Sequence, residues 1–277
     1  MISLLQVLKF HGKTGDTMAD KNYLHAAYAY SADGTDRFTT TYPNLNLIDG
    51  TRDFSGDWVN SDTTTTDGTY KGLTVKKSTI QWNGIYKTFT APEDGVYTFS
   101  AYVKSSGDTA NVYRYVAVNG QDKDELNKLI GNNFDWTRDS INLSLKANDV
   151  VKSRYEISGG GADSIVLTAG HKWEQGSTPT PYMQSASEVT TADWPKYVGT
   201  YVDTNQVSST DPSKYVWDEM KYRVYLDGVP VGGSKLLSFD LENLKAGTTY
   251  NVQVSQINGN IESDKSESVA FKTTLTQ

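Results

Sequence analysis

The sequence has no cysteine among its 277 residues. This absence excludes disulfide bonds, thiolate zinc sites and cysteine nucleophiles, and it is typical of synthesis in a bacterial cytoplasm. Long tracts of Ala, Glu, Lys and Leu are also missing. Because such tracts build helical bundles, their absence favours another fold class.

Positive charge and long apolar runs are scarce as well. The 26 Lys and Arg are outnumbered by 33 Asp and Glu, which gives a net charge of -7 and a pI near 5.0. A phosphate backbone would find few counter-charges, so we expect no nucleic-acid partner and no anionic membrane partner. Neutral polysaccharide stays open as a ligand.

No run of about 18 apolar residues is present, so we expect no membrane insertion. The apolar opening at residues 1–8 lacks the basic region and cleavage site of a secretion signal.

The sequence is rich in aromatic residues and short strand-like segments. It contains 18 Tyr and 6 Trp at a mean hydropathy of -0.53. Ile141, Leu143 and Leu145 alternate with polar residues, and apolar residues share one face in 97–103. A Pro- and Gly-containing turn at 91–95 precedes that strand. Repeated short strands separated by such turns predict an all-β protein built from β-sandwiches.

Changes in composition along the chain predict four regions. Residues 1–45 form an extended N-terminal arm, which is either a flexible terminus or a docking segment. Residues 46–185 form a jelly-roll β-sandwich, and the Ser/Thr/Pro-rich start of 186–220 indicates a connector. Residues 221–277 form a smaller β-sandwich, to which 194–220 would supply the first strands.

The last region resembles a fibronectin type III module. The carrying residues are the run Tyr222–Gly232, together with Leu244, Gly247 and Tyr250. The last three match the tyrosine corner of that family, which implies that the Tyr250 hydroxyl bonds to backbone upstream. Ala246 stands where the family usually has proline.

The larger region resembles the carbohydrate-binding jelly rolls attached to phage tail proteins. The resemblance is carried by Asn46–Thr51, Trp82–Phe89, Gly95–Ser105 and Lys172–Tyr182. Further segments are similar to tail and baseplate proteins of phages that infect lactic acid bacteria: Tyr28–Phe38, Ser187–Gly199 and Ser209–Trp217.

Taken together, most of the chain resembles the accessory baseplate proteins of lactococcal siphophages. The resemblance implies a virion protein of the tail tip, made in the host cytoplasm. It also implies non-catalytic binding of host cell-wall polysaccharide during adsorption. The arm would then attach the protein to other tail or baseplate proteins.

Sugars bind by stacking their C–H faces on aromatic rings, while polar side chains fix the hydroxyls. Eight residues combine these properties and are the candidate saccharide contacts: Trp58, Trp82, Tyr86, Tyr113, Arg114, Tyr115, Trp136 and Arg138. The competing interpretation is that the tryptophans anchor the core at strand starts.

Calcium is a common structural ligand of such jelly rolls. The oxygen-rich candidates are Asp49, Asp53, Asp57 and Glu174. The Asp-x-Asp-x-Asp pattern of a dedicated calcium loop is absent. No other cofactor is expected.

No catalytic motif is present. The sequence has no Gly-x-Ser-x-Gly, no His-Glu-x-x-His and no phosphate-binding loop. The 3 histidines, His11, His25 and His171, are scattered. A carboxylate pair of the glycosidase type cannot be identified from sequence. We therefore expect no enzyme. Three hypotheses remain: a saccharide-binding accessory protein, a purely structural tail decoration, or a fragment of a wall hydrolase.

Overall fold

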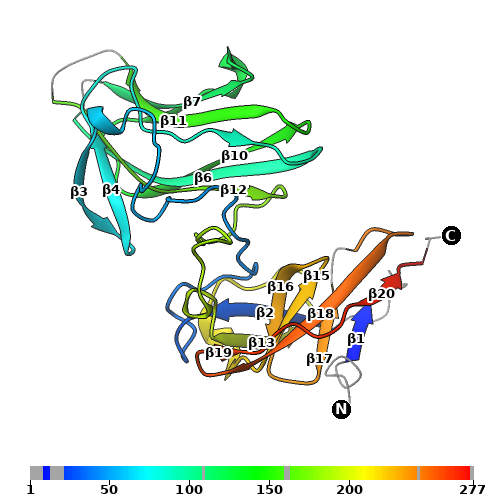
Figure 1. Cartoon of the computed structure of the whole chain (residues 1–277). Helices are drawn as coiled ribbons and strands as arrows, with labels where there is room; N and C mark the ends of the chain where they lie inside the picture. Colours follow the sequence, from blue (N-terminus) through cyan, green and yellow to red (C-terminus); the bar gives the residue numbers. More distant parts are fainter. Residues whose placement is uncertain (1–8, 13–21, 108–109, 159–162, 242–243, 275–277) are drawn as a thin grey trace. The chain divides into compact units, whose positions relative to one another are not determined.

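The computed structural model describes residues 9–12, 22–107, 110–158, 163–241 and 244–274. Strands make up almost all of its regular structure (Figure 1), which confirms the predicted all-β class. Within these ranges the helical elements are four single 3-10 turns, at Ser61–Thr63, Asp124–Leu126, Thr191–Asp193 and Pro212–Lys214. None of the described helical elements has the length and apolar character to cross a membrane.

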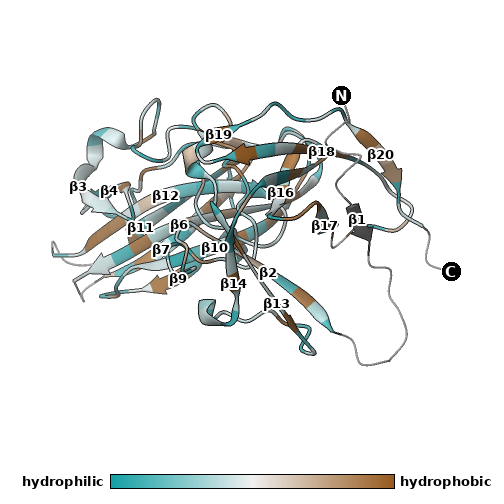
Figure 2. Ribbon diagram, turned by 90° about the horizontal axis from the view of Figure 1, so that it is seen from below, coloured by the Kyte–Doolittle hydropathy of each residue, from teal (hydrophilic) through white to brown (hydrophobic). Residues whose placement is uncertain are grey.

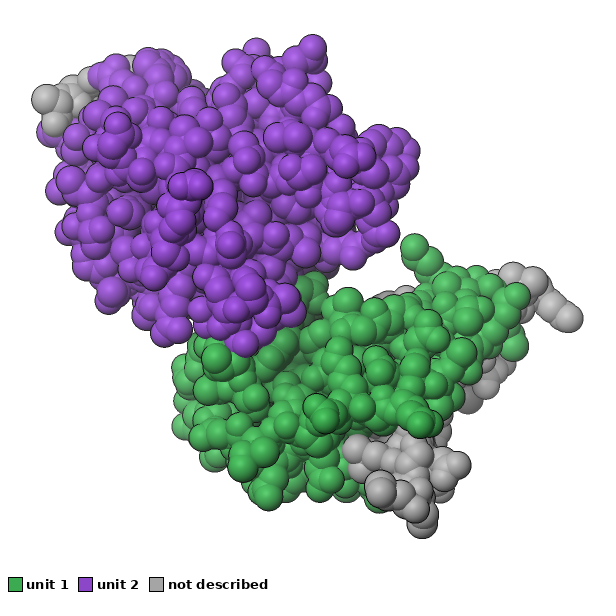
Figure 3. All heavy atoms as spheres, in the orientation of Figure 1, with its two compact units in different colours: residues 1–44, 190–277 green, residues 45–189 purple. Residues whose placement is uncertain are grey.

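The chain forms two compact units (Figure 3). Unit 2 is residues 45–189, and unit 1 combines 1–44 with 190–277. The predicted division into an arm and a connector is therefore corrected: residues from both regions build unit 1. The predicted arm contributes β2 (Tyr23–Ala29), which pairs antiparallel with β13 (Tyr197–Asp203) from the predicted connector. Residues 1–8 and 13–21 of the predicted arm lie outside the described part.

Unit 2 is a sandwich of two five-stranded sheets. Its first sheet, here the β6 sheet, has the order β10 (Thr137–Leu145), β6 (Gly95–Ser106), β12 (Ile165–Gln175), β4 (Leu73–Ser78) and β3 (Thr65–Tyr70). The second, here the β7 sheet, has the order β5 (Phe89–Thr90), β11 (Val150–Ser158), β7 (Asn111–Val118) and β8 (Gln121–Asp122), with β9 (Lys128–Gly131) also on β7.

Period-two alternation places the core of unit 2 between these sheets. Hydropathy changes from residue to residue along its strands (Figure 2). The predicted inward face of β6 is buried, with Tyr97 and Val103 at 0% exposure. Trp173 of β12 is also fully buried, and its ring lies nearly parallel to Phe89, with centroids 4.6 Å apart. Each such aromatic residue removes a large apolar area from water, which makes this core the main source of stability.

Unit 1 is the smaller sandwich. A three-stranded sheet has the order β14 (Val216–Glu219), β13 and β2. A five-stranded sheet contains β16 (Val229–Ser234), β15 (Tyr222–Leu226), β18 (Thr249–Asn258), β19 (Ile261–Glu262) and β20 (Val269–Lys272), and β1 (Lys9–Gly12) pairs in parallel with β17 (Ser238–Leu241).

The tyrosine corner predicted from the fibronectin resemblance is present in unit 1. The backbone N–H of Lys245 donates a hydrogen bond of 2.9 Å to the Tyr250 hydroxyl. The strands expected from 194–220 are also present, as β13 and β14. What the sequence did not indicate is that β2 completes their sheet.

Candidate saccharide-binding face

The outer surface of the β7 sheet gathers tyrosines and cations. On β7, Val112, Arg114 and Val116 point inward and are buried, so Tyr113 and Tyr115 point outward and are half-buried. The register sets β11 beside them, with Arg154 opposite Tyr115 and Glu156 opposite Tyr113. Cross-strand partners on one face lie close enough for their side chains to touch.

Arg154 is held at the centre of this surface. Its guanidinium carbon lies 4.7 Å from the ring centre of Tyr115 and 5.7 Å from that of Tyr86. Its Nε donates to Glu156 Oε2 at 2.8 Å, and Nη2 donates to the carbonyl oxygen of Trp82 at 3.3 Å. A cation over an aromatic face is favourable, and the ion pair fixes the guanidinium plane.

Lys152 reaches the same two rings from the next outward position of β11. Its Nζ is 5.0 Å from the ring centre of Tyr115 and 5.9 Å from that of Tyr86. Neither Lys152 nor Arg154 was a candidate from the sequence. Their alternation with Ser153 and Tyr155, which are buried, would have shown that they share a face.

Trp82 stands beside Arg154 on the loop before β5. It is 59% exposed, and its φ of 56° lies in the left-handed region, which costs a residue with a Cβ about 1–2 kcal/mol. Its backbone N–H donates to the Ile157 carbonyl at 2.9 Å, which ties the loop to the end of β11. The name aromatic face is used below for Trp82, Tyr86, Tyr113, Tyr115, Lys152, Arg154 and Glu156.

Two of the eight predicted contacts are buried and are corrected. Trp58 is 5% exposed and packs edge-on against Phe54, with centroids 4.7 Å apart. Arg114 is 4% exposed and pairs with Asp139 at 2.5 Å inside the sandwich. Burial of a charge requires such a partner. Both side chains therefore support the fold and have no surface to offer a ligand.

Trp136 and Arg138 lie on the outer surface of the other sheet. The Trp136 ring stacks on Tyr70, with centroids 4.2 Å apart and 12° between the planes. Arg138 donates to the Ser100 hydroxyl at 2.9 Å and to the Thr180 carbonyl. The structure therefore splits the remaining six candidates. Trp82, Tyr86, Tyr113 and Tyr115 share the aromatic face, while Trp136 stacks on Tyr70 and Arg138 binds the Thr180 carbonyl on the other sheet.

The four predicted metal ligands are not brought together. Asp49 pairs with Lys87 at 2.5 Å, and this hydrogen bond lowers the pKa of the Asp49 carboxyl. Hydrogen bonds from Ser55, first from its hydroxyl and then from its backbone N–H, lower the pKa of the Asp53 carboxyl. Asp57 is exposed. Across the described ranges no three His, Cys, Asp or Glu side chains cluster as a metal site, so these four residues do not form one common site.

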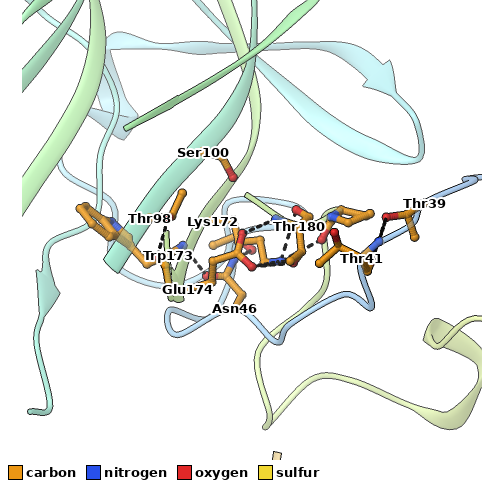
Figure 4. Close-up of polar contacts among 12 residues, drawn as sticks. Thr39, Thr41, Asn46, Thr98, Ser100, Lys172, Trp173, Glu174 and Thr180 are labelled. Atoms are coloured by element: carbon orange, nitrogen blue, oxygen red, sulfur yellow. Dashed lines mark hydrogen bonds and ion pairs between the residues drawn. The ribbon is translucent and has the colours of Figure 1, made fainter. Parts of the chain in front are cut away.

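Glu174, the fourth of these residues, belongs to a buried polar cluster (Figure 4). Its Oε2 lies 3.1 Å from Nζ of Lys172, and both side chains are fully buried. Lys172 also donates to the Thr180 hydroxyl at 2.6 Å and to the Pro181 carbonyl at 2.8 Å. Burial lowers the pKa of Lys172 to about 7. The cluster fastens the segment after β12 to the β6 sheet.

An open hollow of about 580 Å³ lies elsewhere on unit 2, between residues 46–49, 88–90 and 185–187. The ring on its wall, Phe89, is 2% exposed. A buried ring offers no face for a sugar, so the aromatic face is the better candidate.

Comparisons with known proteins agree with the virion assignment. Residues 195–253, all within unit 1, match a family model described as "Minor structural protein 5-like, C-terminal domain". A chain in the structure of the tripod from the baseplate of bacteriophage Tuc2009 is 44% identical, with a TM-score of 0.70; the match covers 94% of this chain and 100% of that one. Such a match defines a structural protein of a phage baseplate. The chain belongs to the accessory baseplate proteins of lactococcal phages, as the resemblance predicted.

Two carbohydrate-binding modules were also found. One is a CBM61 module in complex with beta-1,4-galactotriose (10% identity, 47% of this chain, 99% of that chain). The other is the CBM22-1 xylan-binding domain from Paenibacillus barcinonensis Xyn10C (17% identity, 48% and 97%). Both have a TM-score of 0.37. No curated protein matches the chain.

Proposed function

We propose that this baseplate protein binds a saccharide of the host cell wall on the aromatic face of unit 2, without catalysis, and thereby assists phage adsorption. The observation that carries the proposal is Trp82, a 59% exposed indole held at positive φ beside Arg154. Folding gains little from this side chain, because most of it stays in water. An exposed ring with fixed polar neighbours is what stacking on a sugar requires.

The polar groups of the face support the same function. Arg154 is fixed by Glu156 and by the Trp82 carbonyl, so ligand binding would not have to order it. Arg154 retains donors on Nη1, and sugar hydroxyls accept from such groups. The tyrosine hydroxyls of the face add further hydrogen-bonding atoms.

The face suits binding better than hydrolysis. Glycoside hydrolysis uses two carboxyl groups at a defined separation. Among the seven residues of the aromatic face, Glu156 alone carries a carboxylate, and this carboxylate forms an ion pair with Arg154. We therefore propose that the protein is not an enzyme.

Attachment to other proteins of the tail is the role we propose for unit 1. The match to the minor structural protein model lies entirely within it. The part of the predicted arm from 22 to 44 belongs to unit 1. We therefore assign docking to unit 1 as a whole and not to a separate arm.

A purely structural decoration is the competing function. The burial of Trp58 and the stacking of Trp136 on Tyr70 favour it, because these aromatic residues serve the fold. The two functions differ in what they require of Trp82.

The test is labelling of lactococcal cells by the fluorescent full-length chain. We expect saturable labelling that purified wall polysaccharide competes away and that Trp82→Ala reduces at least tenfold. Trp136→Ala is the matched control, since it removes a half-buried indole from the other sheet, and it should label as the parent does. Multivalent display on beads raises avidity and guards against weak single-site affinity. Equal labelling by parent and Trp82→Ala, or none by displayed protein, would support the structural function.

A further inference from the structure

We infer that the ligand of the aromatic face is an acidic saccharide, one that carries a phosphate or carboxylate group. The inference rests on the proposed function and specifies the chemistry of its ligand. Its starting point is that Lys152 and Arg154 lie over the same two tyrosine rings.

The two cations cover two of the four rings of the aromatic face, and of the other two Trp82 is exposed whereas Tyr113 is half-buried. Arg154 and Lys152 lie within 5.9 Å of the ring centres of Tyr86 and Tyr115. A sugar cannot occupy a ring face that a cation already covers. Trp82 is more exposed than either tyrosine, and no ring contact within the described part of the chain involves it. The sugar ring therefore belongs on Trp82, and the groups beside it meet the cations.

The charges on the face do not balance. Arg154 is neutralised by Glu156, its ion-pair partner at 2.8 Å. Lys152 has no carboxylate within 4.0 Å among the residues that the structure describes. Its register partner on β7 is Ala117, which carries no charge. One ammonium is thus unpaired on a protein whose net charge is -7.

An anionic group on the ligand would complete this arrangement. Arg154 uses Nε on Glu156 and one N–H of Nη2 on the Trp82 carbonyl, so Nη1 keeps both of its N–H groups. Arginine and lysine donors together bind phosphate or carboxylate oxygens more strongly than neutral hydroxyls. Because the chain as a whole is acidic, its sequence left neutral polysaccharide open as a ligand. The local positive charge of the aromatic face favours an acidic saccharide instead.

The test measures binding of the full-length chain to wall polysaccharide from the lactococcal strain that it labels best. Three samples are compared: intact, carboxyl-reduced, and dephosphorylated polysaccharide. We expect the Kd for the intact sample to be at least tenfold lower than for one of the two treated samples. The treatment that raises the Kd identifies the acidic group. Binding should also weaken as salt rises from 0.05 to about 0.5 M, because salt screens exposed charges.

Lys152→Met is the decisive variant, and Lys77→Met is its control. Both remove one positive charge from unit 2, but Lys77 lies on β4 in the other sheet. We expect Lys152→Met to raise the Kd for intact polysaccharide about fivefold at low salt, which is the upper range for an exposed ion pair, and Lys77→Met to leave it unchanged. If all three samples bind equally and Lys152→Met binds like the parent, the acidic ligand is wrong. In that case a continued loss in Trp82→Ala would leave the proposed function standing. Absence of binding to every sample would overturn both.

Discussion

The guanidinium of Arg154 lies 4.7 Å above the ring of Tyr115, its cross-strand partner in the β7 sheet. The same guanidinium donates to Glu156 and to the backbone of Trp82. A strand residue thus connects the tyrosine side of the aromatic face to the loop that presents its exposed indole.

Glu156 should act as a positioning residue for binding. Glu156→Gln keeps the shape of the side chain but removes the charge that holds Arg154. We expect about a fivefold rise in the Kd for wall polysaccharide, because the guanidinium must then be ordered by the ligand. The stoichiometry of polysaccharide binding should change little.

Isothermal titration measures this effect, and Glu219→Gln is the control. Glu219 pairs with Lys221 on the exposed surface of unit 1. If both variants bind like the parent, Glu156 does not position the binding group.

The positive φ of Trp82 should lower the stability of unit 2. At a φ of 56° a Cβ is strained and glycine is not. We expect Trp82→Gly to be about 0.5–1 kcal/mol more stable than Trp82→Ala, after the entropy of glycine in the unfolded chain is counted. Urea denaturation of the two variants measures the difference. A less stable Trp82→Gly would show that the loop relaxes in solution.

His171 should make unit 2 sensitive to acid. Its ring is 1% exposed among Phe54, Trp58, Phe99 and Tyr155, and burial lowers the pKa of His171 to about 3. The unfolded chain takes up a proton near pH 6.5 and the folded chain does not. This contribution to stability is therefore fully present above pH 6.5 and declines as pH falls toward 3, by about 1.5 kcal/mol between pH 6.5 and 5.

His171→Gln removes the titrating group and isolates its share. The free energy of unfolding of unit 2 should fall less steeply with acid in this variant than in the parent. The two pH profiles come from urea denaturation followed by tryptophan fluorescence. Parallel profiles between pH 5 and 6.5 would mean that His171 titrates alike in both states.

The buried ion pair of unit 1 should be costly to break. Arg223 is 2% exposed; it pairs with Glu262 and donates to the Tyr42 hydroxyl at 2.9 Å. Glu262→Ala leaves an uncompensated buried guanidinium, and we expect a loss of about 3–5 kcal/mol. Glu219→Ala breaks an exposed pair and should cost less than about 1 kcal/mol. Thermal unfolding of the two variants compares these losses, and similar losses would show that the Arg223 pair is solvated.

Local patterns in the sequence were enough to predict several strands and the all-β class of the fold. Alternation in 97–103 and 141–145 defined one wall of the sandwich, and the tyrosine corner placed Tyr250. Long-range pairing was beyond such patterns. Tyr42 and Arg223 are 181 residues apart, and no periodicity indicates that β2 joins β13. The division into units therefore followed from the structure alone.

Only part of the candidate site could be predicted, because local alternation is visible in the sequence and long-range strand pairing is not. Tyr113 and Tyr115 share a face because side chains alternate along β7. Lys152 and Arg154 were missed because only the register of β11 on β7 sets them beside these tyrosines. Trp58 and Trp82 were both candidates by residue type, yet one is 5% and the other 59% exposed. Tertiary packing, and not residue type, decides between core and surface.

The most direct test of the account is intrinsic fluorescence during titration of the full-length chain with wall polysaccharide. The chain has 6 tryptophans, and Trp58, Trp173 and Trp194 are buried, so a ligand that stacks on Trp82 should change mainly the emission of that exposed indole. We predict a saturable change in the parent and in Trp136→Phe, and its loss in Trp82→Phe. An equal change in Trp82→Phe would contradict binding on the aromatic face.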